Sequence, residues 1–97
     1  MIAIKAEKDY TVIKPDFDLV SSNLDEIKSV IFDLAIRGHY QIILHLPHNV
    51  VIDPMGVGVI VACRKTLKQY GGDLTAKTDN PEIINLFKML RLDHILE

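Results

Sequence analysis

The chain has very little of several features that would assign it to a specialised class of protein. It contains one cysteine, Cys63, so no disulfide can form within it and we expect a cytoplasmic location. Its 11 basic and 13 acidic residues give a formal net charge of −2, which does not support nucleic acid or an acidic membrane surface as a partner. No apolar run is long enough to cross a bilayer, and the N-terminus lacks the basic and long apolar regions of a signal peptide.

Motifs for catalysis and metal binding are also missing. No nucleophile, base and acid stand in a recognisable arrangement. An enzyme using His45 or His48 is a third alternative, which a deep pocket joining both histidines to a carboxylate would favour. Gly56-Val57-Gly58 begins like a dinucleotide-binding fingerprint, but Val61 stands where a third glycine is needed. We therefore predict no enzyme activity, no cofactor and no metal. The histidines lack the helical i, i+4 spacing of metal ligands: His39, His45, His48 and His94.

What the sequence does have is the composition of an ordinary globular protein. It has 97 residues, of which 48% are hydrophobic and 25% charged. That length fits one compact core, so we predict a single domain over residues 1–97.

Apolar residues recur with the period of a strand or of a helix in seven segments. Residues 42–46 are almost continuously apolar, which predicts a central strand covered on both faces. Strands that alternate with helices imply parallel crossovers. The predicted fold is therefore α/β, a mixed sheet of about four strands with helices packed on it, in the order ββαβαβα. The predicted strands are 2–7, 10–14, 42–46 and 74–78, and the predicted helices are 22–37, 53–70 and 80–90.

The predicted helix ends carry recognisable cap residues. Asp53 and Asn80 are each followed by proline, which suits an N-cap and the first helical position. Ser21 and Ser22 are interpreted as caps of the first helix, with Ser22 the N-cap itself. Glycines at 38 and 71–72 end the first two helices. In the second helix, the spacing predicts one buried face and one solvent-exposed face. The buried face consists of Val59, Ile60, Cys63, Leu67 and Tyr70. The exposed face consists of Arg64, Lys65 and Lys68.

The corner between an apolar strand tail at 50–52 and the helix that follows Asp53 is the most informative stretch. Small residues at Gly56 and Gly58 leave its outer surface bare. Met55 at its tip is either a filler or a contact residue, because an exposed methionine is soft and adapts to a binding partner. We predict that this corner is the functional surface.

Six segments, taken in order, resemble the STAS domain family (sulphate transporter and anti-sigma factor antagonist), and within it the small single-domain anti-sigma factor antagonists. The family's corner reads Asp-Ser-Ser-Gly-Leu-Gly, and here it reads Asp-Pro-Met-Gly-Val-Gly at 53–58. The resemblance covers nearly the whole chain. The segments that carry it are 15–18, 42–47, 51–58, 71–74, 80–83 and 90–96.

The resemblance implies a STAS-like fold and a non-catalytic module that binds another protein. In the family, the second serine of the corner accepts phosphate from a kinase that is also the anti-sigma factor. That position is Met55, which cannot be phosphorylated, while Pro54 replaces the first serine and His45 replaces the aspartate of the family's Asp-Leu-Ser step. The implied function is binding of an anti-sigma factor or serine-kinase-like protein without a phosphorylation switch. An alternative is an accessory subunit of a lipid-transport ATPase or of a signalling complex.

The predicted partner surface combines the corner, the first half of the following helix and the loop at 16–22. Its residues are Asp16, Asp18, Ser21, Asp53, Pro54, Met55, Gly56, Val57 and Gly58.

Overall fold

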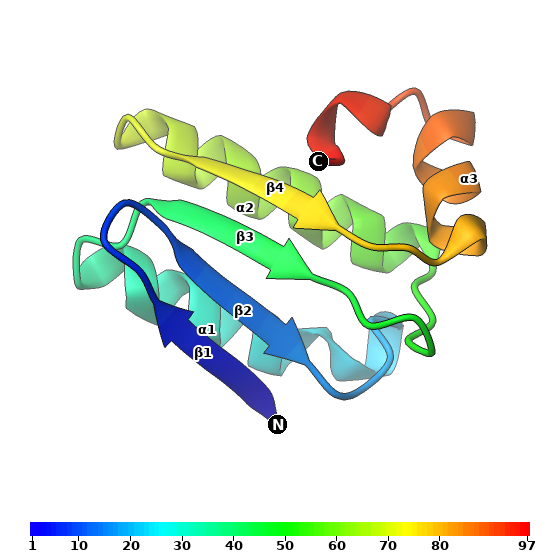
Figure 1. Cartoon of the computed structure of the whole chain (residues 1–97), viewed down its shortest axis with the longest axis horizontal. Helices are drawn as coiled ribbons and strands as arrows, with labels where there is room; N and C mark the ends of the chain where they lie inside the picture. The colour runs from blue at the N-terminus through cyan, green and yellow to red at the C-terminus, as the bar shows by residue number, and fades with distance from the viewer.

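The computed structural model describes residues 1–97 as one four-stranded sheet with two long helices on one face (Figure 1). The observed order ββαβαβα is the predicted one. None of the helices combines the length and apolarity that a membrane crossing requires. The elements are β1 (Ile2–Ala6), β2 (Thr11–Pro15), the 3-10 turn η1 (Ser21–Asn23), α1 (Leu24–Ile36), β3 (Gln41–His45), α2 (Pro54–Gln69), β4 (Asp73–Lys77), α3 (Pro81–Met89) and the 3-10 turn η2 (Asp93–Ile95).

The strands lie in the order β1-β2-β3-β4. β1 and β2 form an antiparallel hairpin, whereas β2, β3 and β4 run parallel to one another. In the register, Thr11 lies opposite Ile42, which lies opposite Leu74. All three are buried, so this row faces the helices, and the next row along each strand must face the other way.

The two faces of the sheet have different surroundings. α1 and α2 lie behind the sheet in Figure 1, and no helix crosses in front of it. Ile43 lies on that open face and is only partly buried. The prediction that this strand is covered on both faces is therefore wrong, because the third helix, α3, lies beyond the C-terminal ends of the parallel strands instead of on the second face (Figure 1).

The hydrophobic core lies between the inner face of the sheet and the helices, and it contains 19 buried apolar residues. The predicted stripe of α1 is buried at all four positions, which are Leu24, Ile27, Ile31 and Leu34. In α3, Ile83 and Phe87 are buried as expected. Leu90, also expected in that stripe, is 42% exposed because the helix has ended by then.

The wet and buried faces of α2 need two corrections. Arg64, expected in water, has a side chain only 16% exposed, and its Nε lies 3.2 Å from Asp73 Oδ1, so it joins α2 to the start of β4. Tyr70, expected in the core, is 59% exposed. Its ring stacks on that of Tyr40 with 5.2 Å between the ring centroids. The ring is therefore packed against another aromatic side chain outside the core.

The helix ends follow the predicted pattern with one exception. Asp53 and Asn80 cap α2 and α3, each with proline at the first helical position. Gly38 and Gly71 have φ values of +89° and +82°, the left-handed conformation that favours glycine after a helix. Ser22 was predicted to cap the first helix, but it lies in η1, and no side chain caps α1.

Candidate functional site

The loop at 16–22 and the segment before α2 are paired along their backbones. Leu19 forms an isolated parallel bridge with Ile52. The Leu19 N–H donates to the Val51 carbonyl at 2.8 Å, and the Asp53 N–H donates to the Leu19 carbonyl at 3.3 Å. The predicted strand tail at 50–52 thus consists of one bridge, and its function is to hold the loop against the corner.

Two aspartates strengthen this pairing. Asp18 Oδ1 accepts a hydrogen bond from the Val51 N–H at 2.9 Å. Asp53 Oδ1 accepts from the Gly56 N–H at 2.8 Å, and its Oδ2 accepts from the Ser21 N–H at 3.2 Å. A carboxylate suits this position because it has two acceptor oxygens and no donor. Ser21 is therefore held by Asp53, and it does not cap α1.

Two of the nine predicted surface residues face the interior. A Cβ at Gly56 would clash with the Leu19 carbonyl oxygen and would lie 2.8 Å from Ile52 Cγ1. Val57 is 1% exposed. Both residues are therefore closed to a partner in this structure, contrary to their place in the predicted surface: Gly56 lies against the loop at Leu19, and Val57 belongs to the hydrophobic core. Gly58 faces open space, with nothing within 4 Å of a Cβ placed there.

The remaining part of the corner is largely exposed, and the carboxylates of Asp18 and Asp53 are its only charged groups. Met55 is 62% exposed and Val51 is 54% exposed. Pro54 and Gly58 are exposed too, and the first turn of α2 contains no acidic residue. On the loop, Asp18 and Ser21 are exposed. We call the surface formed by Asp18, Ser21, Val51, Asp53, Pro54, Met55 and Gly58 the corner surface.

Asp16 does not belong to the corner surface, because its side chain pairs with the N-terminus of the chain. Its Oδ1 lies 2.8 Å from the Met1 amino group, and its backbone N–H donates to the Met1 carbonyl at 3.1 Å. Asp16 therefore fixes the start of β1 beside the end of β2.

Asn80 is a residue of this end of the molecule whose full function the sequence does not reveal. Its Oδ1 caps α3 by accepting from the Glu82 N–H at 2.9 Å. Its Nδ2 donates to the His48 and Val50 carbonyls, at 2.8 and 3.3 Å. The Asn-Pro motif predicts the cap, but nothing local indicates that the amide also holds the segment leading to the corner.

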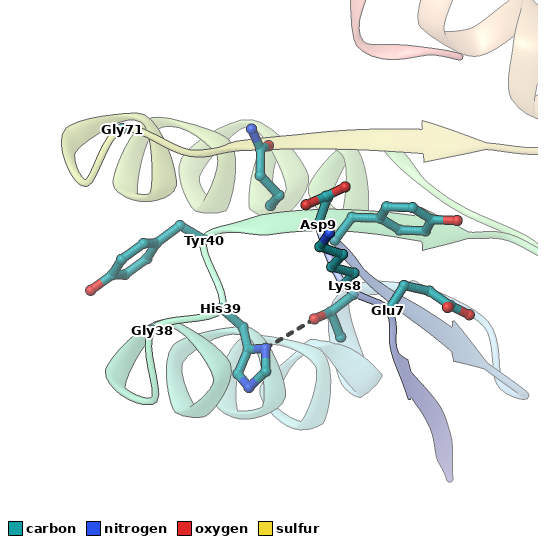
Figure 2. A pocket seen from close by; sticks show the side chains of 10 residues that line it. Glu7, Lys8, Asp9, Gly38, His39, Tyr40 and Gly71 are labelled. Carbon is teal, nitrogen blue, oxygen red and sulfur yellow. Dashed lines mark hydrogen bonds between the residues drawn. The ribbon is translucent and has the colours of Figure 1, made fainter.

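A polar pocket lies at the opposite end of the sheet from the corner, where the parallel strands begin (Figure 2). A hydrogen bond of 3.1 Å joins His39 Nδ1 to the hydroxyl of buried Thr11. Glu7 also lines the pocket, and its carboxylate lies 3.4 Å from Lys5 Nζ. The bond between His39 and Thr11 joins the segment before β3 to the start of β2.

The two histidines weighed as catalytic candidates and the single cysteine lie apart from this pocket. His48 Nδ1 contacts Asp79 Oδ1 at 3.1 Å, with both side chains largely in water. His45 is partly buried at the end of β3. Cys63, predicted to be a core residue, is half-buried in an apolar groove between α1 and α2, where burial raises the pKa of its thiol. No three His, Cys, Asp or Glu side chains gather as a metal ion would require.

Comparison with known proteins adds the family context. The STAS domain model matches residues 1–97. A Thermotoga neapolitana homologue of TM1081, named as a candidate anti-sigma factor antagonist, is 26% identical over 98 residues, covering 100% of this chain and 87% of that protein. The candidate antagonist of Thermotoga maritima has the same identity and coverage.

Solved structures agree with the architecture. The crystal structure of TM1081 from Thermotoga maritima has a TM-score of 0.83 at 25% identity, covering 99% of this chain and 83% of that one. The anti-sigma factor antagonist SpoIIAA in its unphosphorylated form has a TM-score of 0.69 at 18% identity, covering 91% and 82%. The phosphorylated form of Bacillus SpoIIAA has a TM-score of 0.70 at 15% identity, covering 100% and 89%. The predicted STAS-like α/β fold is thereby confirmed.

Proposed function

We propose that this chain, which belongs to the STAS domain family, is a non-catalytic module that binds an anti-sigma factor or a serine-kinase-like protein through its corner surface. The observation that carries the proposal is the exposed patch around Met55, whose only charged side chains, Asp53 and Asp18, hold it in place by hydrogen bonds. A patch that is already ordered loses little entropy when a partner binds. Relatives named as candidate antagonists support this class of partner.

The proposal includes the lack of a phosphorylation switch at residue 55. By resemblance, Met55 occupies the position of the family's phosphorylated serine, and a thioether has no hydroxyl to accept phosphate. In place of a switched charge, Met55 supplies a flexible apolar contact at the centre of the surface. Binding would then depend on the abundance of the partner and not on the phosphorylation state of this chain.

A pull-down from the native cell with paired variants tests the surface. Met55→Asp places a charge at the centre of the corner surface, and we expect it to abolish capture of one specific protein. Met89→Asp is the matched control, because Met89 is a methionine 79% exposed on α3 and outside the corner surface. If both variants capture the same partners as the wild type, the interface lies elsewhere.

A phosphorylation assay tests the missing switch separately. The captured partner, if it has kinase activity, is mixed with ATP and with wild type or Met55→Ser. We expect phosphate on the Met55→Ser variant alone, at the restored hydroxyl beside the start of α2, where backbone donors favour an anion. Stoichiometric labelling of the wild-type chain would contradict the unswitched function.

A further inference from the structure

The open face of the sheet presents a central uncharged row between two charged ends. Val12, Ile43 and Thr75 lie side by side across β2, β3 and β4, and all three are partly buried although no helix lies over them. Lys5 continues the row on β1, opposite Val12, and its charge is paired with Glu7 at 3.4 Å. The middle of this face is therefore uncharged or internally neutralised.

The two ends of the face carry opposite charges. Beyond the C-terminal side of this central row lie Lys14, His45 and Lys77, with both lysines exposed. On the N-terminal side, Asp9 and Asp73 line one hollow of about 290 Å³, together with Glu97. Glu97 is held on this face because its Oε2 accepts a hydrogen bond of 2.8 Å from the Thr75 hydroxyl. Asp73 already contacts Arg64 and Lys68, so Asp9 and Glu97 are the carboxylates available to an outside partner.

We propose that a second copy of this chain covers the face, forming a two-fold symmetric dimer in which the sheets stack with their strands running in opposite directions. A two-fold axis that is parallel to the sheet and perpendicular to the strands brings Ile43 onto the same residue of the partner copy. The same axis places Lys14 and Lys77 over Asp9 and Glu97 of the partner, so each charged end meets its opposite. Such complementarity favours this orientation over the parallel one, in which like charges would meet.

The size of the face sets the strength of the dimer. Four strands of five residues offer a face of roughly 19 by 17 Å at ordinary sheet spacings. Two such faces cover about 650 Å² in total, below the range of stable specific interfaces, so the dimer is weak and reversible. The hollow at the acidic end provides room for the long lysine side chains of the partner. This contact leaves the corner surface free. Failure of the dimer would therefore not contradict the proposed function, and failure of the proposed function would not contradict the dimer.

Charge-reversal variants provide the decisive experiment. Lys14→Glu/Lys77→Glu makes both ends of the face acidic, and Asp9→Lys/Glu97→Lys makes both ends basic. In sedimentation equilibrium between about 10 μM and 1 mM, we expect the wild type to dimerise, each variant alone to stay monomeric, and an equimolar mixture to form a one-to-one dimer. The wild-type dimer should weaken when NaCl is raised from about 50 to 500 mM, because salt screens exposed charges.

Several results would overturn the proposal. A wild type that stays monomeric at the highest concentration would exclude the dimer. Dimers that survive in both charge variants but disappear in Phe32→Ser would place the contact in the groove between α1 and α2, where Phe32 is 63% exposed. If a charge variant fails to fold by circular dichroism, the amide shifts of the wild type on dilution decide the matter. They must change at Val12, Ile43 and Thr75, and changes confined elsewhere would contradict the dimer.

Discussion

The starts of α2 and α3 use the same local sequence for different purposes. Asp53-Pro54 and Asn80-Pro81 both place a cap residue before a proline at the first helical position. Both cap side chains also hold a neighbouring segment. Asp53 accepts from the Ser21 N–H, whereas Asn80 donates to two carbonyl groups of the segment before α2. The choice of aspartate or asparagine therefore follows from the group that the neighbour presents, since only the amide can donate.

The next two helical positions show how the purposes differ. The second position is exposed Met55 in α2 and acidic Glu82 in α3. The third is Gly56, pressed by the Leu19 backbone, in α2 and buried Ile83 in α3. α3 thus begins as a structural helix, with an acidic first turn and a core anchor. α2 begins beneath the loop at Leu19 on one side and leaves Pro54, Met55 and Gly58 exposed on the other.

The strongest test of this comparison is a pair of glycine variants in α2. Gly56→Ala forces its Cβ against the Leu19 carbonyl oxygen, and we expect unfolding free energy to fall by about 3 kcal/mol. Gly58→Ala meets nothing, and it should raise stability by about 0.5–1 kcal/mol because alanine favours a helix. Urea denaturation measures both. Similar effects for the two variants would mean that the loop does not press on α2.

The second largest change in stability is expected when the amide that caps α3 is replaced by a carboxylate. Asn80→Asp keeps an oxygen to cap Glu82 but replaces the donor to the His48 and Val50 carbonyls with a second acceptor. We expect a loss of about 2 kcal/mol, since both carbonyls lose their partner. Asn85→Asp, an exposed change on the same helix, should change the midpoint of urea denaturation very little. Equal effects at the two positions would count against a tether function for Asn80.

The reciprocal exchange in α2 should cost less. Asp53→Asn can cap Gly56 or accept from Ser21 with its single oxygen, but it cannot do both. We expect a loss of about 1 kcal/mol, because one exposed hydrogen bond of 3.2 Å is broken. Thermal denaturation is the measurement, with Asp33→Asn on the surface of α1 as the control. Unchanged stability of Asp53→Asn would show that the loop is held by the backbone pairing alone.

The smallest effect concerns the missing acid in the first turn of α2. Met55→Glu should stabilise the protein by about 0.3–1 kcal/mol, because a negative charge near a helix N-terminus is favourable. Met89→Glu, at the last residue of α3, should destabilise it by a similar amount. Denaturation at low and high salt separates this effect from packing, because salt screens it. A stability loss at Met55 that persists in high salt would indicate packing contacts beneath the methionine.

Local patterns were sufficient for much of the fold. The caps at Asp53 and Asn80, the glycine stops at 38 and 71, and the stripe of α1 all rest on groups within about four residues of one another. Such groups meet whenever the helix forms, so their arrangement could be predicted. Ser22 was predicted wrongly because a serine before a helix is only a cap when the backbone turns correctly, and here η1 intervenes.

The surface of the corner could be predicted only in part. Met55, Pro54 and Gly58 are exposed as expected, whereas Gly56 and Val57 are not. The sequence does not distinguish Gly56 from Gly58, because both lie in the first two turns of α2. Only the position of Leu19 makes one of them a close contact and the other an open site.

The sequence by itself determined the order of elements, the ends of the second and third helices and the residue types at the corner. The tertiary structure alone decided that Ser21 meets Asp53 across 32 positions, that Asn80 holds His48 and Val50, and that one face of the sheet stays uncovered. The physical reason is that periodicity and capping are local, whereas a contact between distant segments depends on how the whole core packs. A residue's side of a helix can be predicted from spacing, but which segment covers that side is settled only when the chain has folded.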